Sequence, residues 1–455
     1  MSFVSKFLLS CTLIAAAQSA QAGVDTTVVT PANSSVSSIA VTPESIVLPT
    51  SQSAPRETAL DKKQMAKRET PNNRASAERS APPPEFTLPN DPHPSLTPST
   101  IVATAKLADV YRRISDRGGW PKVVALSPGD RGKQVAALKE RLAAEGDLDP
   151  RTISDTPNVY DKTISAAVNT FQARMGLKAT GIVSGATLSA MNVPALKRYQ
   201  QMVATSQRLS QMRLSFSDRY IVVNLPSATV EAVKSGQVAQ RFVAIVGDVE
   251  HQSPEVVARA QAVNLNPTWT VPASIIKNEF IPKLLKDKDY LSKLRIRVLD
   301  MHNKEVDPAK IDWTNEQMVA NYLLRQDSGA GNSLGEIRIN MPNRHAVYMH
   351  DTPSKRLFGK DNRFLSHGCV RVQGVYDLAS WILEGAPNAP AFSGWSKPEL
   401  LKKVATNEQI ELKLVREVPV MWVYMTGWAG ADGKAHFRED VYGRDGQDKQ
   451  RVSTR

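Results

Sequence analysis

The sequence predicts an α+β protein of several domains: a small bundle of three short helices, then a mainly β domain with a helical insertion. Three observations predict this class. At 455 residues the chain is longer than one ordinary domain. Apolar residues recur at helical spacing within 127–193, and short β-branched runs bounded by turn residues follow from about residue 217. With 41% hydrophobic residues, the folded part can bury a full core.

Residues 1–22 have the pattern of a cleaved export signal. Lys6 supplies the positive charge, an apolar run follows from Phe7, and Ala20-Gln21-Ala22 is a small-x-small cleavage site. The run is short for a transmembrane helix. The alternative is a lipoprotein signal at Leu8-Leu9-Ser10-Cys11. We therefore expect a periplasmic protein exported through a cleaved signal peptide, with lipoprotein anchoring as the weaker interpretation.

The next stretch, 23–100, is predicted to be a disordered linker. It is rich in Ser, Thr, Pro and Ala, and Phe86 is its only aromatic residue, so it buries too little apolar surface to offset its ordering entropy. Helical scaffold segments are predicted at 101–126 and 194–216, on either side of the bundle. The last residues, 446–455, are predicted to be a polar tail.

The bundle at 127–193 combines three short helices with glycine turns. It begins at Gly129-Asp130-Arg131-Gly132, and its later turn contains Gly176-Leu177 and Thr180-Gly181. The residues that face inward at helical spacing are Val135, Leu138, Leu142, Ile164, Ala167, Val168, Phe171, Leu188 and Met191. The glycines and the Phe171-Gln172 pair resemble the peptidoglycan-binding domain type 1 family. The alternative is a helical spacer whose glycines are helix caps.

A mainly β domain is predicted at 217–445, interrupted by a charged helical insertion at about 274–334. Its strands are expected where β-branched residues cluster between turn signals. These runs are Tyr220 to Asn224, Phe242 to Gly247, Ala346 to Met349, Val370 to Val372 and Val418 to Met425.

Charge and cysteine content narrow the function. A net charge of +12 suits an anionic surface, and export favours cell-wall polymer over nucleic acid. Signal cleavage would remove Cys11 and leave Cys369 alone in an oxidising compartment. A lone cysteine can have a purely structural role, as a buried free thiol or in an intermolecular disulfide. A lone cysteine beside histidines is instead a candidate nucleophile.

The chemistry is concentrated in Tyr348-Met349-His350 and in Ser366-His367-Gly368-Cys369-Val370-Arg371. Cys369 follows a glycine and precedes a β-branched run, where a tight turn enters a strand. An imidazole can take the thiol proton, and the residues alone leave both His350 and His367 open as the base. Gly368 lets the backbone approach a substrate, so the N–H groups of Gly368 and Cys369 can hold an oxyanion.

Metal binding is the rival interpretation of the same cluster. His345, His350, His367 and Cys369 could supply four ligands, but their spacing lacks the usual paired form, and one thiol is sparse for structural zinc. We therefore expect no metal at this cluster, and we also expect no organic cofactor.

Ser366 to Arg371, preceded by His350, resembles the signature of YkuD-type L,D-transpeptidases. Val347 to Pro353, Asn266 to Pro272 and Tyr442 to Asp445 are similar to the larger, YcbB-like branch. The resemblance implies that His350 is the base and that the helical insertion caps the substrate.

The resemblance also implies roles for the neighbouring residues. The backbone carbonyl of Asp351 would orient His350, and His367 would line the pocket beside the oxyanion hole. The other residues implied in substrate binding are Arg371, Tyr348, Ser366 and Trp269, with core packing as the alternative for Trp269.

The implied substrate is peptidoglycan, with its tetrapeptide stems and glycan strands. Cys369 would release D-alanine from a tetrapeptide, and an amine of a second stem would capture the thioester as a 3–3 cross-link. Carbapenem-type inhibitors would acylate Cys369. The alternatives are an L,D-carboxypeptidase, an enzyme that anchors an outer-membrane protein, a general cysteine endopeptidase, and a catalytically silent wall-binding scaffold.

Overall fold

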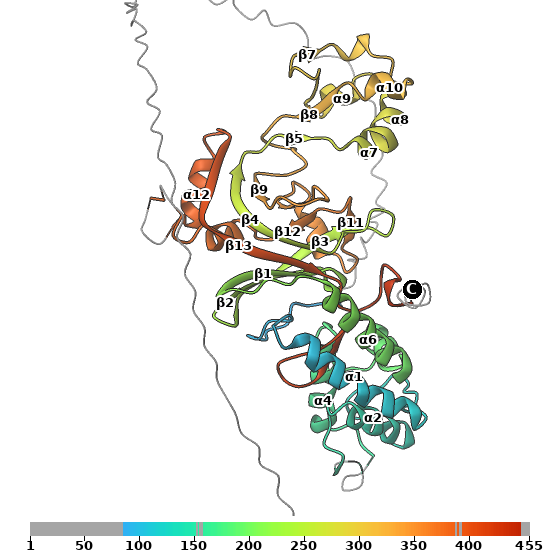
Figure 1. Cartoon of the computed structure of the whole chain (residues 1–455). Coiled ribbons are helices and arrows are strands. Elements are labelled where there is room, and N and C mark those ends of the chain that lie inside the picture. The colour runs from blue at the N-terminus through green and yellow to red at the C-terminus, as the bar shows by residue number, and fades with distance from the viewer. Residues whose placement is uncertain (1–84, 152, 154–157, 387–388, 391–393, 447–455) are drawn as a thin grey trace, which may run out of the picture. The chain divides into compact units, whose positions relative to one another are not determined.

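The computed structural model describes residues 85–151, 153, 158–386, 389–390 and 394–446. The predicted signal peptide, most of the predicted linker and almost all of the predicted polar tail lie outside these residues. All described residues belong to one compact unit, Arg79–Arg455. Within it, no described helix is both long and apolar enough to cross a membrane. The predicted α+β class is confirmed, with a helical region followed by a β-rich domain (Figure 1).

The helical region contains α1 (Thr100–Asp116), α2 (Lys133–Ala144), α4 (Lys162–Arg174), α5 (Gly185–Met191) and α6 (Ala195–Gln211). Helix α4 begins where Asp161 accepts a hydrogen bond from the N–H of Ile164 at 3.0 Å, a side-chain N-cap. The apolar residues predicted to face inward on α2 and α4 do so: Val135, Leu138, Leu142, Val168 and Phe171 are all 0% exposed.

Residues 85–99 differ from the prediction of a disordered linker. The N–H of Glu85 donates to the carboxylate of Asp361 at 3.0 Å, and Phe86 pairs with Leu177 in a β-bridge. Leu96 is fully buried. The composition of this segment did not predict its order, because one buried leucine and a set of backbone hydrogen bonds are enough to hold it when the rest of the fold supplies their partners.

The β-rich domain is built on a nine-stranded sheet in the order β11-β3-β12-β10-β9-β4-β13-β1-β2. Because β2 also pairs with β3, the eight strands from β3 to β2 in this order close into a ring. Strand β11 lies outside the ring and pairs with β3. The strands are β1 (Arg219–Asn224), β2 (Thr229–Lys234), β3 (Gln237–Gly247), β4 (Val256–Leu265), β9 (Ile337–Asn340), β10 (Met349–His350), β11 (Phe364–Ser366), β12 (Val370–Val372) and β13 (Ile410–Val423). Helices α11 (Val375–Ile382) and α12 (Lys397–Val404) pack against its core.

The insertion is mixed rather than helical, which corrects the prediction. A four-stranded sheet in the order β5-β8-β6-β7 accompanies the short helices. Its elements are β5 (Trp269–Thr270), α7 (Ala273–Ile275), the π-helical turn η2 (Ile276–Phe280), α8 (Ile281–Leu284), α9 (Tyr290–Lys293), β6 (Ile296–Leu299), β7 (Glu305–Val306), α10 (Glu316–Val319) and β8 (Leu323–Gln326). Strands of two to four residues are too short to show a period-two pattern, so the sequence did not predict them.

A C-terminal hairpin joins the β-rich domain to the helical region. Strands β14 (Gly427–Ala429) and β15 (Ala435–Phe437) pair antiparallel, and Phe437 enters the core of the helical bundle. Its ring packs edge-to-face with Tyr111 of α1 at 5.4 Å between centroids. The hairpin therefore ties the two regions together through apolar contacts.

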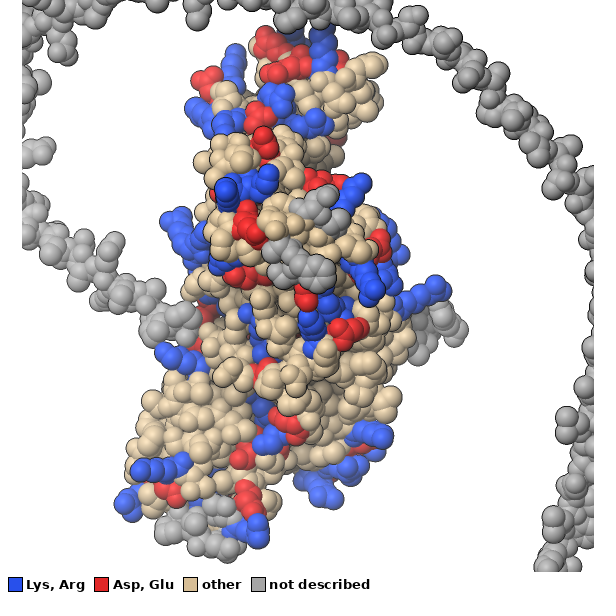
Figure 2. All heavy atoms as spheres, turned by 90° about the vertical axis from the view of Figure 1, so that its left-hand side faces the viewer, with Lys and Arg blue, Asp and Glu red and all other residues tan. Residues whose placement is uncertain are grey.

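Charged residues of both signs are interspersed over the face shown in Figure 2, with wide uncharged areas between them. The net charge of +12 is therefore not gathered into one continuous basic patch on that face.

Candidate active site

Sheet register aligns the strand of the predicted base with the strand that follows the predicted nucleophile. Strands β10 and β12 are parallel neighbours, with Met349 opposite Val370 and His350 opposite Arg371. Met349 and Val370 are fully buried in the core. Side chains alternate along a strand, and paired residues of neighbouring strands project to the same face. By this alternation His350 and Arg371 lie on the other side of their strands from Met349 and Val370, while Tyr348 and Cys369, which precede the paired core residues, are partly buried against the same core.

Cys369 lies directly before β12, as predicted for a turn that enters a strand. It is a free cysteine with a partly buried side chain. Burial raises the pKa of its thiol to about 11, although the backbone of Tyr348 and the cation of Arg371 both act to lower it. The thiol is therefore protonated at neutral pH in this conformation.

His350 is 4% exposed, and its imidazole is neutral at the same pH. Burial first, and the nearby guanidinium of Arg371 second, lower the pKa of His350 to about 3. The backbones of Asp351 and Leu334 act in the opposite direction. Among the described residues, Nδ1 of His350 has no hydrogen-bond partner. Cys369 and His350 are thus both neutral at neutral pH and do not form an ion pair.

The predicted role of Asp351 as a backbone carbonyl that orients His350 stays a prediction. Its backbone is close enough to raise the pKa of His350, but no hydrogen bond reaches Nδ1 of the imidazole. The carboxylate of Asp351 is engaged elsewhere: it contacts Lys355 and accepts from the N–H of Glu336 at 3.2 Å.

The loop before Cys369 is held by serine hydroxyls. Gly368 has a φ of 101°, a conformation that favours glycine, and its N–H donates to Ser366 Oγ at 3.3 Å. Ser366 Oγ in turn donates to the carbonyl of Cys369 at 2.5 Å. The side chain of Ser366 is buried, and its predicted role in substrate binding stays a prediction. Of the two predicted oxyanion donors, the N–H of Gly368 is therefore already engaged.

His367 directly precedes Gly368, whose φ of 101° interrupts the extended backbone before β12. Its Nε2 lies 2.6 Å from Oε1 of Glu279, which belongs to η2 of the insertion. Its ring also lies 4.5 Å from that of His251. His367 therefore links the loop before Cys369 to the insertion, a contact that the sequence did not reveal.

Tyr348 and Trp269 lie near each other at the root of the insertion. The ring of Tyr348 packs edge-on to His350 at 5.6 Å, and the guanidinium of Arg338 lies 5.6 Å from the Tyr348 ring centroid. Burial raises the pKa of Tyr348, and the Trp269 side chain acts against that rise. Trp269 also packs against Phe280 in the core of the insertion, so both interpretations of this residue have support.

Arg371 is partly buried, and its Nε atom has no hydrogen-bond partner among the described residues. Its cation acts on both Cys369 and His350 and lowers the pKa of each. His345 is exposed and hydrogen-bonds to Arg344 at 3.1 Å. No group of three or more His, Cys, Asp or Glu side chains in the described part of the chain is arranged to hold a metal ion.

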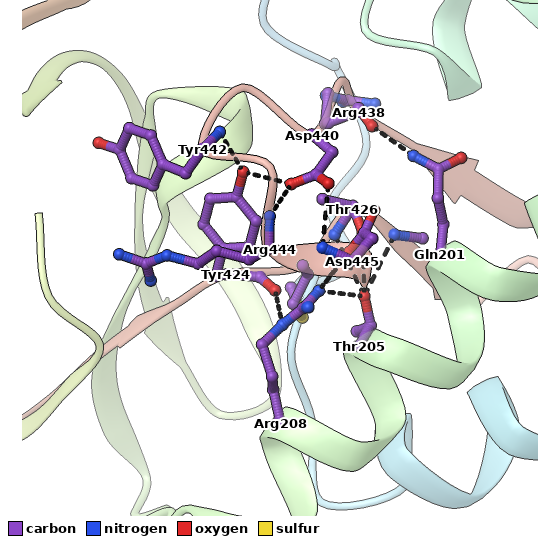
Figure 3. A network of polar contacts seen from close by, with 12 residues as sticks. Gln201, Thr205, Arg208, Tyr424, Thr426, Arg438, Asp440, Tyr442, Arg444 and Asp445 are labelled. Carbon is purple, nitrogen blue, oxygen red and sulfur yellow. Dashed lines mark hydrogen bonds and ion pairs between the residues drawn. The ribbon is translucent and has the colours of Figure 1, made fainter. Parts of the chain in front are cut away.

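A buried polar network supports the C-terminal segment behind the site (Figure 3). Arg208 of α6 pairs with Asp445 at 2.9 Å and donates to the carbonyl of Tyr424 at 3.0 Å. The hydroxyl of Tyr424 donates to Asp440 at 2.8 Å and accepts from the N–H of Tyr442 at the same distance. The network therefore connects the helical scaffold to Tyr442.

A cavity of about 690 Å³ lies away from this chemistry. It is lined by the end of the bundle, α6 and the approach to β11, and neither Cys369 nor His350 contributes to its wall.

Comparison with known proteins assigns both regions. Residues 218–389 match the family described as "L,D-transpeptidase catalytic domain" (YkuD), and residues 131–191 match the "Putative peptidoglycan binding domain" family. A Haemophilus influenzae protein named "Putative L,D-transpeptidase" is 33% identical over 227 residues, which are 50% of this chain and 45% of that protein. The chain thus spans less than half the length of that relative.

Two solved L,D-transpeptidase structures are more distant. The one from Xylanimonas cellulosilytica is 16% identical, with a TM-score of 0.22 over 66% of this chain and 98% of the solved chain. The one from Stackebrandtia nassauensis is 13% identical, with a TM-score of 0.23 over 66% of this chain and 96% of its own.

Proposed function

Since the chain contains a YkuD-family L,D-transpeptidase catalytic domain and a domain of the peptidoglycan-binding type 1 family, we propose that it forms 3–3 cross-links between peptidoglycan stems. Cys369 is the nucleophile, His350 the base and a D-alanine-terminated tetrapeptide the acyl donor. The observation that carries the proposal is the parallel pairing of β10 with β12, in which His350 is opposite Arg371 and Met349 is opposite Val370, the residue after Cys369.

In the first half-reaction, sulfur of Cys369 attacks the carbonyl carbon of the third stem residue while His350 accepts the thiol proton. A C–S bond forms, and the carbonyl π electrons move to oxygen as an oxyanion. The oxyanion then collapses, the C–N bond to D-alanine breaks, and the imidazolium protonates the departing amine. Because the pKa of the thiol is about 11 and that of the imidazole about 3, proton transfer accompanies attack rather than preceding it.

In the second half-reaction, an amine of a neighbouring stem attacks the thioester and His350 accepts its proton. A second oxyanion forms and collapses, the C–S bond breaks, and the imidazolium returns a proton to sulfur. Both halves pass through an oxyanion at the same place, so one preorganised donor serves twice. Carbapenem-type β-lactams would enter the first half-reaction as acyl donors and stop at the acyl-enzyme.

Water as acceptor would make the protein an L,D-carboxypeptidase, and a lysine of an outer-membrane protein would make it an anchoring enzyme. The partner in every case is peptidoglycan, which the second domain would help to hold. This chemistry requires a periplasmic protein, so we also propose export through the signal sequence at residues 1–22.

The test is intact-mass analysis of the full chain incubated with disaccharide-tetrapeptide, with Cys369→Ala and His350→Ala as comparisons. We expect an adduct that has lost D-alanine, followed by a 3–3 dimer, both absent in Cys369→Ala. Tripeptide without dimer would replace the proposal by a carboxypeptidase. No adduct, with binding to peptidoglycan retained, would leave a wall-binding scaffold and overturn it.

A further inference from the structure

A buried serine far from the signature contacts the nucleophile loop. Ser253 lies in the turn between β3 and β4 and is fully buried. Its hydroxyl accepts from the N–H of Gly247 at 2.9 Å and donates to the carbonyl of Gly368 at 2.8 Å. One oxygen atom therefore links this turn to the peptide bond that precedes Cys369.

This hydrogen bond sets the direction of an N–H group. In a trans peptide the carbonyl and the following N–H point in opposite directions. The carbonyl of Gly368 points toward Ser253, so the N–H of Cys369 points away from it, out of the buried turn. No hydrogen bond from that N–H to another described residue is present. The N–H of Gly368, by contrast, already donates to Ser366. The N–H of Cys369 is therefore the free donor.

The turn that carries Ser253 is held on its other side. Gly247 has no space for a side chain, because a Cβ there would overlap the carbonyl oxygen of His251 and the amide nitrogen of Ser253. The hydroxyl of Tyr442 donates to the carbonyl of Gly247 at 2.6 Å and lies 3.4 Å from the N–H of Ser253. Tyr442 is itself held by the network of Figure 3. Ser253 thus has little freedom to move relative to Gly368.

We propose that Ser253 is a positioning residue that fixes the Gly368–Cys369 peptide so that the N–H of Cys369 is preorganised for the oxyanion. The inference rests on the proposed acyl-transfer function. It concerns charge that develops only during acylation, so Ser253 contributes to the transition state and not to the nucleophilicity of sulfur.

Two reactions of the same thiol separate these effects. Iodoacetamide alkylates sulfur by displacing iodide and forms no oxyanion, whereas p-nitrophenyl acetate acylates it through a tetrahedral oxyanion. Both rates are measured on the full chain carrying Cys11→Ala, so that Cys369 is the sole thiol. The variants are Ser253→Ala and Ser253→Thr. Ser227→Ala is the matched control, because Ser227 is also buried but hydrogen-bonds to the carbonyl of Asn224.

For Ser253→Ala we expect acylation to slow about 10-fold to 100-fold, below the full effect of removing an oxyanion donor. Alkylation should change by no more than about twofold, since that step develops no oxyanion. Ser253→Thr should recover most of the acylation rate because it retains a hydroxyl. The control should change neither reaction.

Equal losses in both reactions, or no loss of acylation, would overturn the inference. If Ser253→Ala does not fold, Tyr442→Phe tests the inference in its place, because it removes only the hydroxyl that holds the turn. Tyr442→Phe should then slow acylation selectively, and an unchanged ratio of the two rates would overturn the inference. Disaccharide-tetrapeptide is measured in parallel. Its failure to acylate the wild type would refute the proposed substrate, while the two-probe ratio would still report on Ser253.

Discussion

The resting thiol of Cys369 should be unreactive at neutral pH and become reactive only in alkali. Its pKa of about 11 leaves about one thiolate in ten thousand molecules at pH 7. Four pKa units correspond to about 5 kcal/mol for ionising the resting thiol at pH 7 without help from a base. The physical cause is burial, which costs the thiolate its hydration and outweighs the favourable charge of Arg371.

The assay is the rate of iodoacetamide alkylation of the Cys11→Ala chain between pH 6 and pH 10, followed by intact mass. We expect the rate to rise about tenfold per pH unit, with no plateau below pH 10. His350→Gln should leave this profile unchanged, because the imidazole that it removes is already neutral throughout the range. Arg371→Gln should slow alkylation at every pH, because it removes the cation that favours the thiolate.

A plateau below pH 8 would refute this reasoning. It would mean that Cys369 and His350 form a thiolate–imidazolium pair in the resting protein and that burial is not the dominant effect. Circular dichroism over the same pH range shows whether the fold persists, so that alkaline unfolding is not mistaken for ionisation.

Three further predictions concern stability. Leu96→Ala should lower the free energy of unfolding, measured by urea denaturation, by about 2–5 kcal/mol because Leu96 is fully buried. The control is Leu196→Ala, whose side chain is 50% exposed, and it should lower that free energy far less. Equal effects would show that the segment at 85–99 is not packed. Arg208→Met should lower the free energy of unfolding by about 3–5 kcal/mol in the same assay, because it leaves Asp445 buried without the cation that pairs with it. A loss under about 1 kcal/mol would contradict this prediction. Protonation of His350 is disfavoured in the folded state, with a pKa of about 3 against 6.5, so stability should fall as pH drops below 6.5. Between pH 7 and pH 5 the wild type should lose about 2 kcal/mol more than His350→Gln, and parallel losses would contradict the lowered pKa.

Local pattern was enough to predict the helices of the bundle and several strands of the sheet. Phe171 and Val168 recur at helical spacing and are buried, and Val370 to Val372 form β12 as expected. The strands of the insertion were not predicted from local pattern, because they contain only two to four residues, too few for a period to appear. The burial of Leu96 was not predicted because it depends on partners that lie far along the chain.

By itself the sequence determined the chemical identity of the candidate site: Cys369 after a glycine, and His350 two residues after Tyr348 on the same side of a strand. These facts depend on residue type and on local backbone geometry, which neighbouring residues specify. Only the tertiary structure decided that His350 lies opposite Arg371, that His367 meets Glu279 of the insertion, and that Ser253 reaches Gly368 across 115 positions. Contacts of this kind follow from strand register and chain topology, and these are set by the packing of the whole domain rather than by any local stretch of sequence.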